Sequence, residues 1–358
     1  MQIVKESIFI SAIRSFFNAL LAMVGVLIGL VIIAALVFSF SPSYQSSDED
    51  IVMEIMPDEK GNSEVLAETT PAILRIDIHG VIGDAHLNGE LVESFLRASR
   101  RGFLKNDRVK AVLLNINSPG GTVIDSDIIY KALLEYKKRF NVPIYAYTSG
   151  LCASGGYYIA CASEKINSSQ VAIIGSVGTK FGPMFNFWDL MQKYGVDSVT
   201  LTDGKYKEKF PSFSKLPEGK NKTASYQDLI EITSQAYEQF IGIVLKARLN
   251  KGLNKTDLID QYGARVFIGP TAQTHGYVDD GTSSYNETLN ELLHAANIDP
   301  DSAYQVVRFS HKKSPIQDLV NGHLDLLSGQ LQESILGIPR QQKWNNKLLY
   351  HYDIQNSL

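Results

Sequence analysis

An uncharged apolar stretch near the N-terminus constrains this chain more than any other feature. Residues 16–40 are predominantly hydrophobic and carry no charged side chain. A helix of about 20 such residues crosses the hydrocarbon core of a bilayer, where an irregular segment would leave backbone groups without hydrogen bonds. We therefore predict a transmembrane anchor over residues 16–40, preceded by a short cytoplasmic stub over residues 1–15.

Charges on either side of the anchor predict its orientation. Lys5 and Arg14 precede it, whereas the charged residues that follow are acidic: Asp48, Glu49, Asp50, Glu54, Asp58 and Glu59. Because positive charges favour the cytoplasmic side, the N-terminus is expected in the cytoplasm and the rest of the chain on the outer, periplasmic side of the cytoplasmic membrane. A cleaved signal peptide is the alternative, although the apolar core is longer than a usual signal core and no small-x-small cleavage site closes it.

The remaining chain divides into three parts. Residues 41–71 are acidic and rich in serine, which is typical of a flexible tether. Residues 72–300 alternate strands with helices, which predicts a layered α/β domain with mainly parallel strands. Residues 301–358 form a C-terminal extension of unassigned role, with a helical apolar pattern from Ile316 to Leu331. Within the domain, strands are expected at 72–83, 109–116, 142–147 and 171–174, an extended segment is expected at 198–209, and helices are expected at 91–101, 123–140, 157–162, 184–194, 223–248 and 255–262.

A serine among small residues is the first candidate for chemistry. The apolar strand at 142–147 leads into a stretch that contains Ser154, Gly155 and Gly156, and a helical pattern follows. A serine at the start of a helix can expose its hydroxyl there, and the free backbone N–H groups favour developing negative charge. The alternative is that Ser154 is an ordinary helix N-cap.

Two further stretches bear on the same chemistry. Pro119, Gly120 and Gly121 follow the strand at 109–116, and such a turn can place backbone N–H groups beside the strand end, as an oxyanion hole requires. An ordinary strand-to-helix turn is the alternative. The second stretch has lysines at alternate positions, which share one face if the segment is extended and otherwise form a solvated charged edge: Lys205, Lys207 and Lys209.

Together these stretches resemble the signal peptide peptidase A family of membrane-anchored Ser-Lys peptidases. The resemblance covers residues 72–281 and implies the α/β fold shared by Clp peptidases and crotonases. Five motifs occur in order, which is more specific than any one of them. They are Asn117-Ser-Pro-Gly-Gly121, Ala153-Ser-Gly-Gly-Tyr-Tyr158, Ile174-Gly-Ser-Val-Gly178, Gly204-Lys-Tyr-Lys207 and Arg265-Val-Phe-Ile-Gly-Pro-Thr-Ala272 with the following His-Gly-Tyr-Val-Asp279.

The resemblance implies a role for each candidate residue. Ser154 would be the nucleophile and Lys207 the general base, while the N–H groups of Gly121 and Gly155 would form the oxyanion hole. Ser176 would orient Lys207, although a serine that caps its own turn at a strand end is the alternative. The implied substrates are apolar peptides near the membrane, such as remnants of cleaved signal peptides, which would be hydrolysed through an acyl-enzyme without metal or other cofactor.

The histidines of the chain make a Ser-His pair poorly supported. No histidine lies between His86 and His275, so none follows Ser154 closely. A lysine base must be neutral, which requires that burial or neighbouring cations lower its pKa by several units. Lys205 and Lys209 flank Lys207 and could add to that effect, but only the resemblance selects Lys207 from the three.

Composition and domain number restrict the partners. The net charge of −4 gives no indication of a nucleic-acid surface. Cys152 and Cys161, the only two cysteines, are interpreted as small buried residues, with a disulfide between them as the alternative.

The domain occurs once, whereas some members of the family carry two copies. We therefore expect a homo-oligomeric ring that places Lys207 of one subunit beside Ser154 of the next. Rival functions are a catalytically inactive membrane scaffold and a crotonase-type enzyme that acts on acyl-thioesters.

Overall fold

The structure is a computed structural model that describes residues 8–39, 51–201, 203, 212–215 and 220–311 of the 358-residue chain. The chain forms two units, residues 1–47 and residues 48–358. The first contains helix α1 (Ile8–Ser39), in which the segment Ile13–Leu30 is long and apolar enough to cross a membrane, as judged by length and composition. This helix overlaps the stretch predicted to be the anchor.

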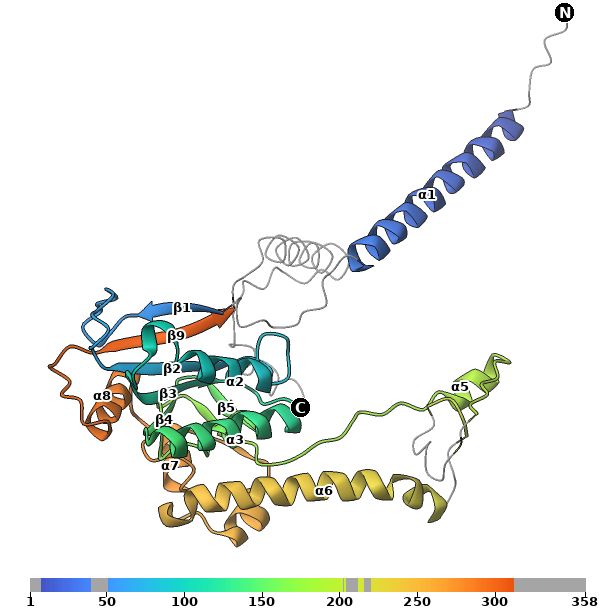
Figure 1. The fold of residues 1–358 in the computed structure, drawn as a ribbon. Coiled ribbons are helices and arrows are strands. Elements are labelled where there is room, and N and C mark those ends of the chain that lie inside the picture. The colour runs from blue at the N-terminus through green and yellow to red at the C-terminus, as the bar shows by residue number, and fades with distance from the viewer. Residues whose placement is uncertain (1–7, 40–50, 202, 204–211, 216–219, 312–358) are drawn as a thin grey trace, which may run out of the picture. The chain divides into compact units, whose positions relative to one another are not determined.

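A six-stranded sheet forms the centre of the second unit (Figure 1). All neighbouring strands are parallel except the first pair, which is antiparallel. Its inner strands bury apolar residues on both of their faces, because helices cover both faces of the sheet. The predicted layered α/β domain with mainly parallel strands is therefore confirmed. In spatial order, the strands are β1 (Ile51–Met56), β9 (Gln305–His311), β2 (Ala72–His79), β3 (Val109–Asn117), β4 (Ile144–Thr148) and β6 (Lys165–Ser168).

Helices α2 (Gly89–Ala98) and α3 (Val123–Phe140) cover one face of this sheet, and α8 (Tyr285–Ala295) covers the other. Side chains alternate between the two faces along each strand. Ile76 accordingly packs in the cluster that contains residues of α2 and α3, whereas Ile73 packs in the cluster that contains residues of α8.

A smaller three-stranded sheet carries the turn that contains Ser154. It consists of β5 (Leu151–Ala153), β7 (Ile173–Gly175) and β8 (Val266–Ile268), with β7 in the middle. Helix α4 (Gly155–Ala160) begins one residue after β5 ends, and an isolated bridge between Ser118 and Cys152 links this sheet to the end of β3.

The long helix α6 (Lys220–Arg248) is fixed to the domain at its C-terminal end. Only 1% of the Arg248 side chain is exposed. Its guanidinium donates from Nε to the carbonyl of Gly276 at 2.8 Å and from Nη1 to Asp279 at 2.7 Å. The shorter elements are α5 (Trp188–Lys193), α7 (Gly269–Thr274), two 3-10 turns at Gly102–Leu104 and Leu249–Lys251, and a π-helix at Asp257–Tyr262.

The structure differs from the sequence-based expectations at both ends of the domain. β1 lies within residues 41–71, where a flexible tether was expected, and β9 lies within the expected C-terminal extension. The two strands pair in an antiparallel register, and Glu54 of β1 accepts hydrogen bonds from Arg308 and Ser310 of β9. The apolar pattern expected to form a helix at 316–331 lies outside the described residues.

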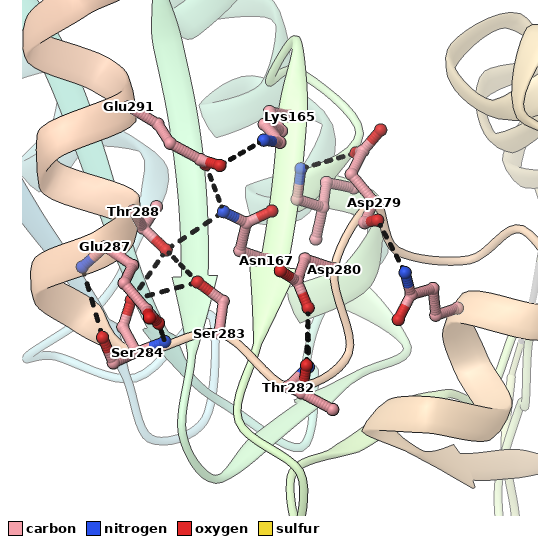
Figure 2. Close-up of polar contacts among 12 residues, drawn as sticks. Lys165, Asn167, Asp279, Asp280, Thr282, Ser283, Ser284, Glu287, Thr288 and Glu291 are labelled. Atoms are coloured by element: carbon pink, nitrogen blue, oxygen red, sulfur yellow. Dashed lines mark hydrogen bonds and ion pairs between the residues drawn. The ribbon is translucent and has the colours of Figure 1, made fainter.

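β6 is a strand that hydrophobic patterning did not predict. Its Asn167 is fully buried and donates from Nδ2 to Glu291 at 2.7 Å and to Thr288 at 3.2 Å, while Lys165 forms an ion pair with Glu291 at 2.6 Å. Figure 2 shows these contacts between the strand and helix α8. Polar partners from another element therefore hold a strand whose own sequence, Lys-Ile-Asn-Ser, is mostly polar.

Candidate active site

The backbone at Ser154 has an uncommon conformation. Ser154 connects β5 to α4 with φ of 51° and ψ of −121°. A positive φ is uncommon for a residue with a side chain and is found where surrounding structure enforces it, often at functional sites. A serine in a sharp strand-to-helix turn is also the geometry of a nucleophile elbow, which exposes the hydroxyl. The side chain makes no capping hydrogen bond, so Ser154 is not a conventional N-cap.

Glycines around Ser154 allow the chain segments to approach closely. A Cβ atom at Gly120, which has φ of 99°, would lie 2.7 Å from Ser154 Cβ and 3.0 Å from its Oγ. A Cβ at Gly155 would lie 2.4 Å from the hydroxyl oxygen of Ser126. Such separations are too short for real atoms, so any side chain at these positions would push against Ser154 or its neighbours.

Gly121 lies in a segment that is paired with Ile82. The N–H of Ile82 donates to the carbonyl of Gly120 at 3.0 Å, and the N–H of Thr122 donates to the carbonyl of Ile82 at 2.9 Å. This parallel pattern uses the peptide groups on either side of Gly121, so the N–H of Gly121 points away from Ile82. Within the described part of the chain, the N–H groups of Gly121 and Gly155 have no hydrogen-bond acceptor, which leaves both able to bind a ligand oxygen.

Ser176 lies close to this turn in the small sheet. The N–H of Ser154 donates to the carbonyl of Gly175 at 2.9 Å, and Ser176 follows directly with φ of 55° and its own N–H bonded to the carbonyl of Arg265 at 2.8 Å. The structure thus brings together Ser154, Gly121, Gly155 and the Gly175–Ser176 segment. Lys207 lies outside the described residues, as do Lys205 and Lys209.

A pocket with about 280 Å³ of space opens beside Ser154. The rings of Tyr158 and Phe240 lie 5.1 Å apart at this pocket. The enclosed part of this pocket is far smaller than a typical small-molecule site. The pocket is lined by Gly121, Val123, Ser126, Ser154, Gly155, Tyr158, Gly178, Thr179, Ala236 and Phe240.

Burial raises the pKa values of one tyrosine and two cysteines near Ser154. The hydroxyl of Tyr158 donates to Asp127 at 2.8 Å and accepts from Gln239 at 2.8 Å, and burial followed by the bond to Asp127 raises the pKa of Tyr158. Cys152 and Cys161 are buried and unpaired. Burial raises the pKa of Cys161 to about 12 and raises the pKa of Cys152 as well, so neither thiol competes with Ser154 as a nucleophile.

Sequence reasoning missed the segment around Ile82. Its backbone fixes the Gly120–Thr122 loop, and its side chain is fully buried. Gly80 and Gly83, which follow β2 and both have positive φ, were the available signal for a special turn at this place. The contact with the Gly120–Thr122 loop depends on pairing between distant segments, which local pattern does not report.

Comparison with known proteins shows similarity to one family of peptidases. The model of peptidase family S49 matches residues 136–299, an interval that contains Ser154 and Ser176. A protein of Enterococcus faecium assigned as a signal peptide peptidase SppA is 31% identical over 233 residues, which is 61% of this chain and 64% of that protein. Protease 4 of Haemophilus influenzae is 29% identical over 270 residues, which is 75% of this chain and 40% of the relative.

The chain thus spans less than two thirds of the length of either relative. Among solved structures, a ClpP1 variant from Listeria monocytogenes is similar with a TM-score of 0.35 and 17% identity, covering 57% of this chain and 88% of the other. From the family model and the relatives, the matched parts of the chain are similar to peptidase family S49 and to proteins of the signal peptide peptidase A type.

Proposed function

We propose that this chain is a membrane-anchored serine endopeptidase that cleaves apolar peptides, such as remnants of cleaved signal peptides, with a dyad of Ser154 and Lys207. The observation that carries the proposal is the Ser154 turn. Its positive φ exposes a serine hydroxyl next to the two N–H groups of Gly121 and Gly155, which have no acceptor within the described residues. Similarity to peptidase family S49 supports the reaction class.

The mechanism is acyl transfer. Neutral Lys207 takes the proton of the Ser154 hydroxyl while Oγ bonds to the peptide carbonyl carbon, and the carbonyl oxygen becomes an anion that accepts hydrogen bonds from the N–H groups of Gly121 and Gly155. The C–N bond then breaks, and Lys207 returns the proton to the leaving amine. Water, deprotonated by Lys207, attacks the ester and releases the acid product and free Ser154. Ser176 holds the lysine amine in place.

Exposed apolar side chains near the turn support an apolar peptide as substrate. Val123 and Ile124 lie in the first turn of α3, next to Gly121, and are 46% and 73% exposed, while Val81 precedes Ile82 and is 54% exposed. An extended apolar peptide bound beside Ser154 would cover these side chains. The name of the Enterococcus faecium relative also points to signal peptides.

The proposed assembly is a ring of identical subunits at the outer face of the cytoplasmic membrane. Helix α1 would anchor each subunit, which raises the effective concentration of its neighbours. Several large apolar side chains in residues 181–201 are exposed in the single chain, among them Phe185 at 63%, Tyr194 at 70% and Leu201 at 93%. Contact with a neighbouring subunit would bury them, and Lys207 would reach Ser154 of that neighbour.

The test is active-site labelling of the full chain in detergent with a fluorophosphonate, followed by peptide mapping of the adduct. We expect one adduct, on Ser154, and no labelling or turnover of an apolar peptide by Ser154→Ala. Ser149→Ala changes an exposed serine in the preceding turn and serves as the matched control with normal activity. Turnover of the peptide by Ser154→Ala would show that Ser154 is not the nucleophile, and absence of peptide turnover by the unaltered chain would favour an inactive scaffold or a crotonase-type enzyme.

A further inference from the structure

The loop that carries Gly121 is held by a second segment, residues 82–89, which comprises most of the connection between β2 and α2 and the first residue of α2; we call this segment the 82–89 loop. The two backbone hydrogen bonds of Ile82, described above, attach it to Gly120 and Thr122. The side chains of Thr122 and Asp125 also lie against the backbone of Gly83. A Cβ atom at Gly83 would lie 2.5 Å from Thr122 Cγ2 and 3.0 Å from a carboxylate oxygen of Asp125. The direction of the Gly121 N–H therefore depends on how the 82–89 loop is held.

Asp125 joins the two loops. Its Oδ1 accepts the N–H of Gly89 at 2.9 Å, and its Oδ2 accepts the hydroxyl of Thr122 at 2.5 Å. Thr122 is the N-cap of α3, and its hydroxyl oxygen accepts the N–H of Asp125 at 3.1 Å. One carboxylate thus connects the first residue of α2, the cap of α3 and the end of the Gly121 loop.

This arrangement differs from a capping box, in which the third helical residue accepts the backbone N–H of the N-cap residue. The N–H of Thr122 is unavailable to Asp125 because it donates to Ile82. Helix α8 has the ordinary form: Ser284 accepts the N–H of Glu287, and Glu287 accepts the N–H of Ser284 (Figure 2). Asp125 therefore does more than close the end of its own helix.

We propose that Asp125 is a positioning residue for the oxyanion hole. It holds the Thr122 hydroxyl and the 82–89 loop together, so that the N–H of Gly121 keeps its direction toward the oxygen that becomes negatively charged. This inference rests on the proposed function. A cap that only stabilised α3 would change the stability of the protein and would leave the rate of the chemical step unchanged.

The experiment compares two pairs of variants of the full chain in detergent. Asp125→Ala and Thr122→Val remove the contacts in the Gly121 loop, and Ser284→Ala and Glu287→Ala remove the equivalent contacts in α8, on the other face of the sheet. Thermal unfolding, kcat and KM for an apolar peptide, and the inhibition constant of a matching peptide aldehyde are measured for each. The aldehyde forms a tetrahedral adduct whose oxygen occupies the same hole.

We expect Asp125→Ala and Thr122→Val to lower kcat by about tenfold, which is less than the roughly 100- to 1,000-fold for deletion of an oxyanion donor. KM should stay within about twofold, and the aldehyde should bind more weakly in proportion to the loss of kcat/KM. Thr122→Ser keeps the hydroxyl and should retain near-normal kcat. The α8 variants should lower the unfolding temperature with normal kcat.

A normal kcat in both Asp125→Ala and Thr122→Val, with Ser154→Ala inactive, would overturn the inference and leave the proposed function intact. Equal losses of kcat in the α8 pair would also overturn it, because general destabilisation would then explain the effect. If Asp125→Ala does not fold, the comparison of Thr122→Val with Thr122→Ser decides. Turnover by Ser154→Ala would contradict the proposed function itself.

Discussion

Replacement of Asp279 by asparagine tests whether one buried ion pair fixes the end of α6. The carboxylate accepts from Arg248 at 2.7 Å, forms an ion pair with Lys251 at 2.6 Å and accepts the N–H of Ile166 at 2.9 Å. Only 1% of the Arg248 side chain and 6% of the Asp279 side chain are exposed. Asp279→Asn keeps the shape of the side chain but leaves the guanidinium buried without a counter-charge.

Breaking a buried ion pair by removing one partner costs about 3–5 kcal/mol, because the remaining charge has no compensation. We expect the lower end of that range, about 3 kcal/mol, because asparagine can still accept the N–H of Ile166. The Lys251 side chain is 44% exposed and can return to water, so Lys251→Met should cost at most about 1 kcal/mol. The double variant Arg248→Met, Asp279→Asn should lose less than the two single losses added together.

The pH dependence gives a second readout. Burial by itself would raise the pKa of Asp279, but the charge of Arg248 and the hydrogen bonds from Lys251 and Ile166 outweigh it and hold that pKa below its ordinary value. The stabilisation is therefore present above the unfolded-state pKa of about 3.9 and is lost as the pH falls through the folded-state value. Asp279→Asn should remove that part of the acid sensitivity.

Urea unfolding of the full chain in detergent, followed by near-ultraviolet circular dichroism between pH 3 and pH 7, measures both effects. A loss smaller than about 1 kcal/mol at pH 7 would refute the argument that this pair fixes α6, because a solvated surface pair would give that value. An acid dependence identical to that of the unaltered chain would show that Asp279 does not titrate as described.

Three further predictions concern the active site. Gly155→Ala should destabilise the fold by about 1–3 kcal/mol through contact with the Ser126 hydroxyl, and adding Ser126→Ala should restore much of that loss in thermal unfolding. Lys207→Ala should be inactive while Lys205→Ala is active. A pH–rate profile of the unaltered chain should show activity that rises with pH through a lysine pKa well below its ordinary value. Inactive Ser154→Ala and Lys207→Ala chains should regain part of the activity when assembled together, and mixed oligomers without activity would place the dyad within one chain.

The sequence predicted the elements whose local signals are strong. β2 and β3 are rich in buried aliphatic residues, and α3 begins directly after its capping residue Thr122; β3 and α3 lie close to their predicted bounds, whereas β2 ends at His79, four residues before its predicted end. β5 was missed because three residues are too few to show a period. β6 was missed because its stability comes from partners on α8 rather than from its own residues.

The candidate site also contains some features that local sequence predicted and others that depend on distant contacts. The Gly120–Gly121 turn was recognisable from the sequence because glycine fits a turn with close backbone approach, whereas the catalytic role of Ser154 stays a prediction. The contacts of Ile82 and Asp125 were not recognisable from the sequence. Ile82 bonds to a loop that lies about 40 residues further along the chain, and Asp125 accepts the N–H of the distant Gly89 instead of the N–H of its own N-cap residue. The choice of Lys207 among three lysines rested on resemblance alone and stays a prediction.

The pairing of β1 with β9 determines where a soluble form of this protein can be cut. Ile51 lies opposite His311 and Met56 opposite Val306, so β1 covers the outer side of β9 except at Gln305. A protein that starts at residue 72, where the folded domain was expected to begin, would lack β1 and would expose the backbone and apolar side chains of β9 as a new sheet edge. Unpaired edges of this kind promote aggregation. A protein that starts a few residues before Ile51 would keep the edge covered and should remain soluble without its anchor.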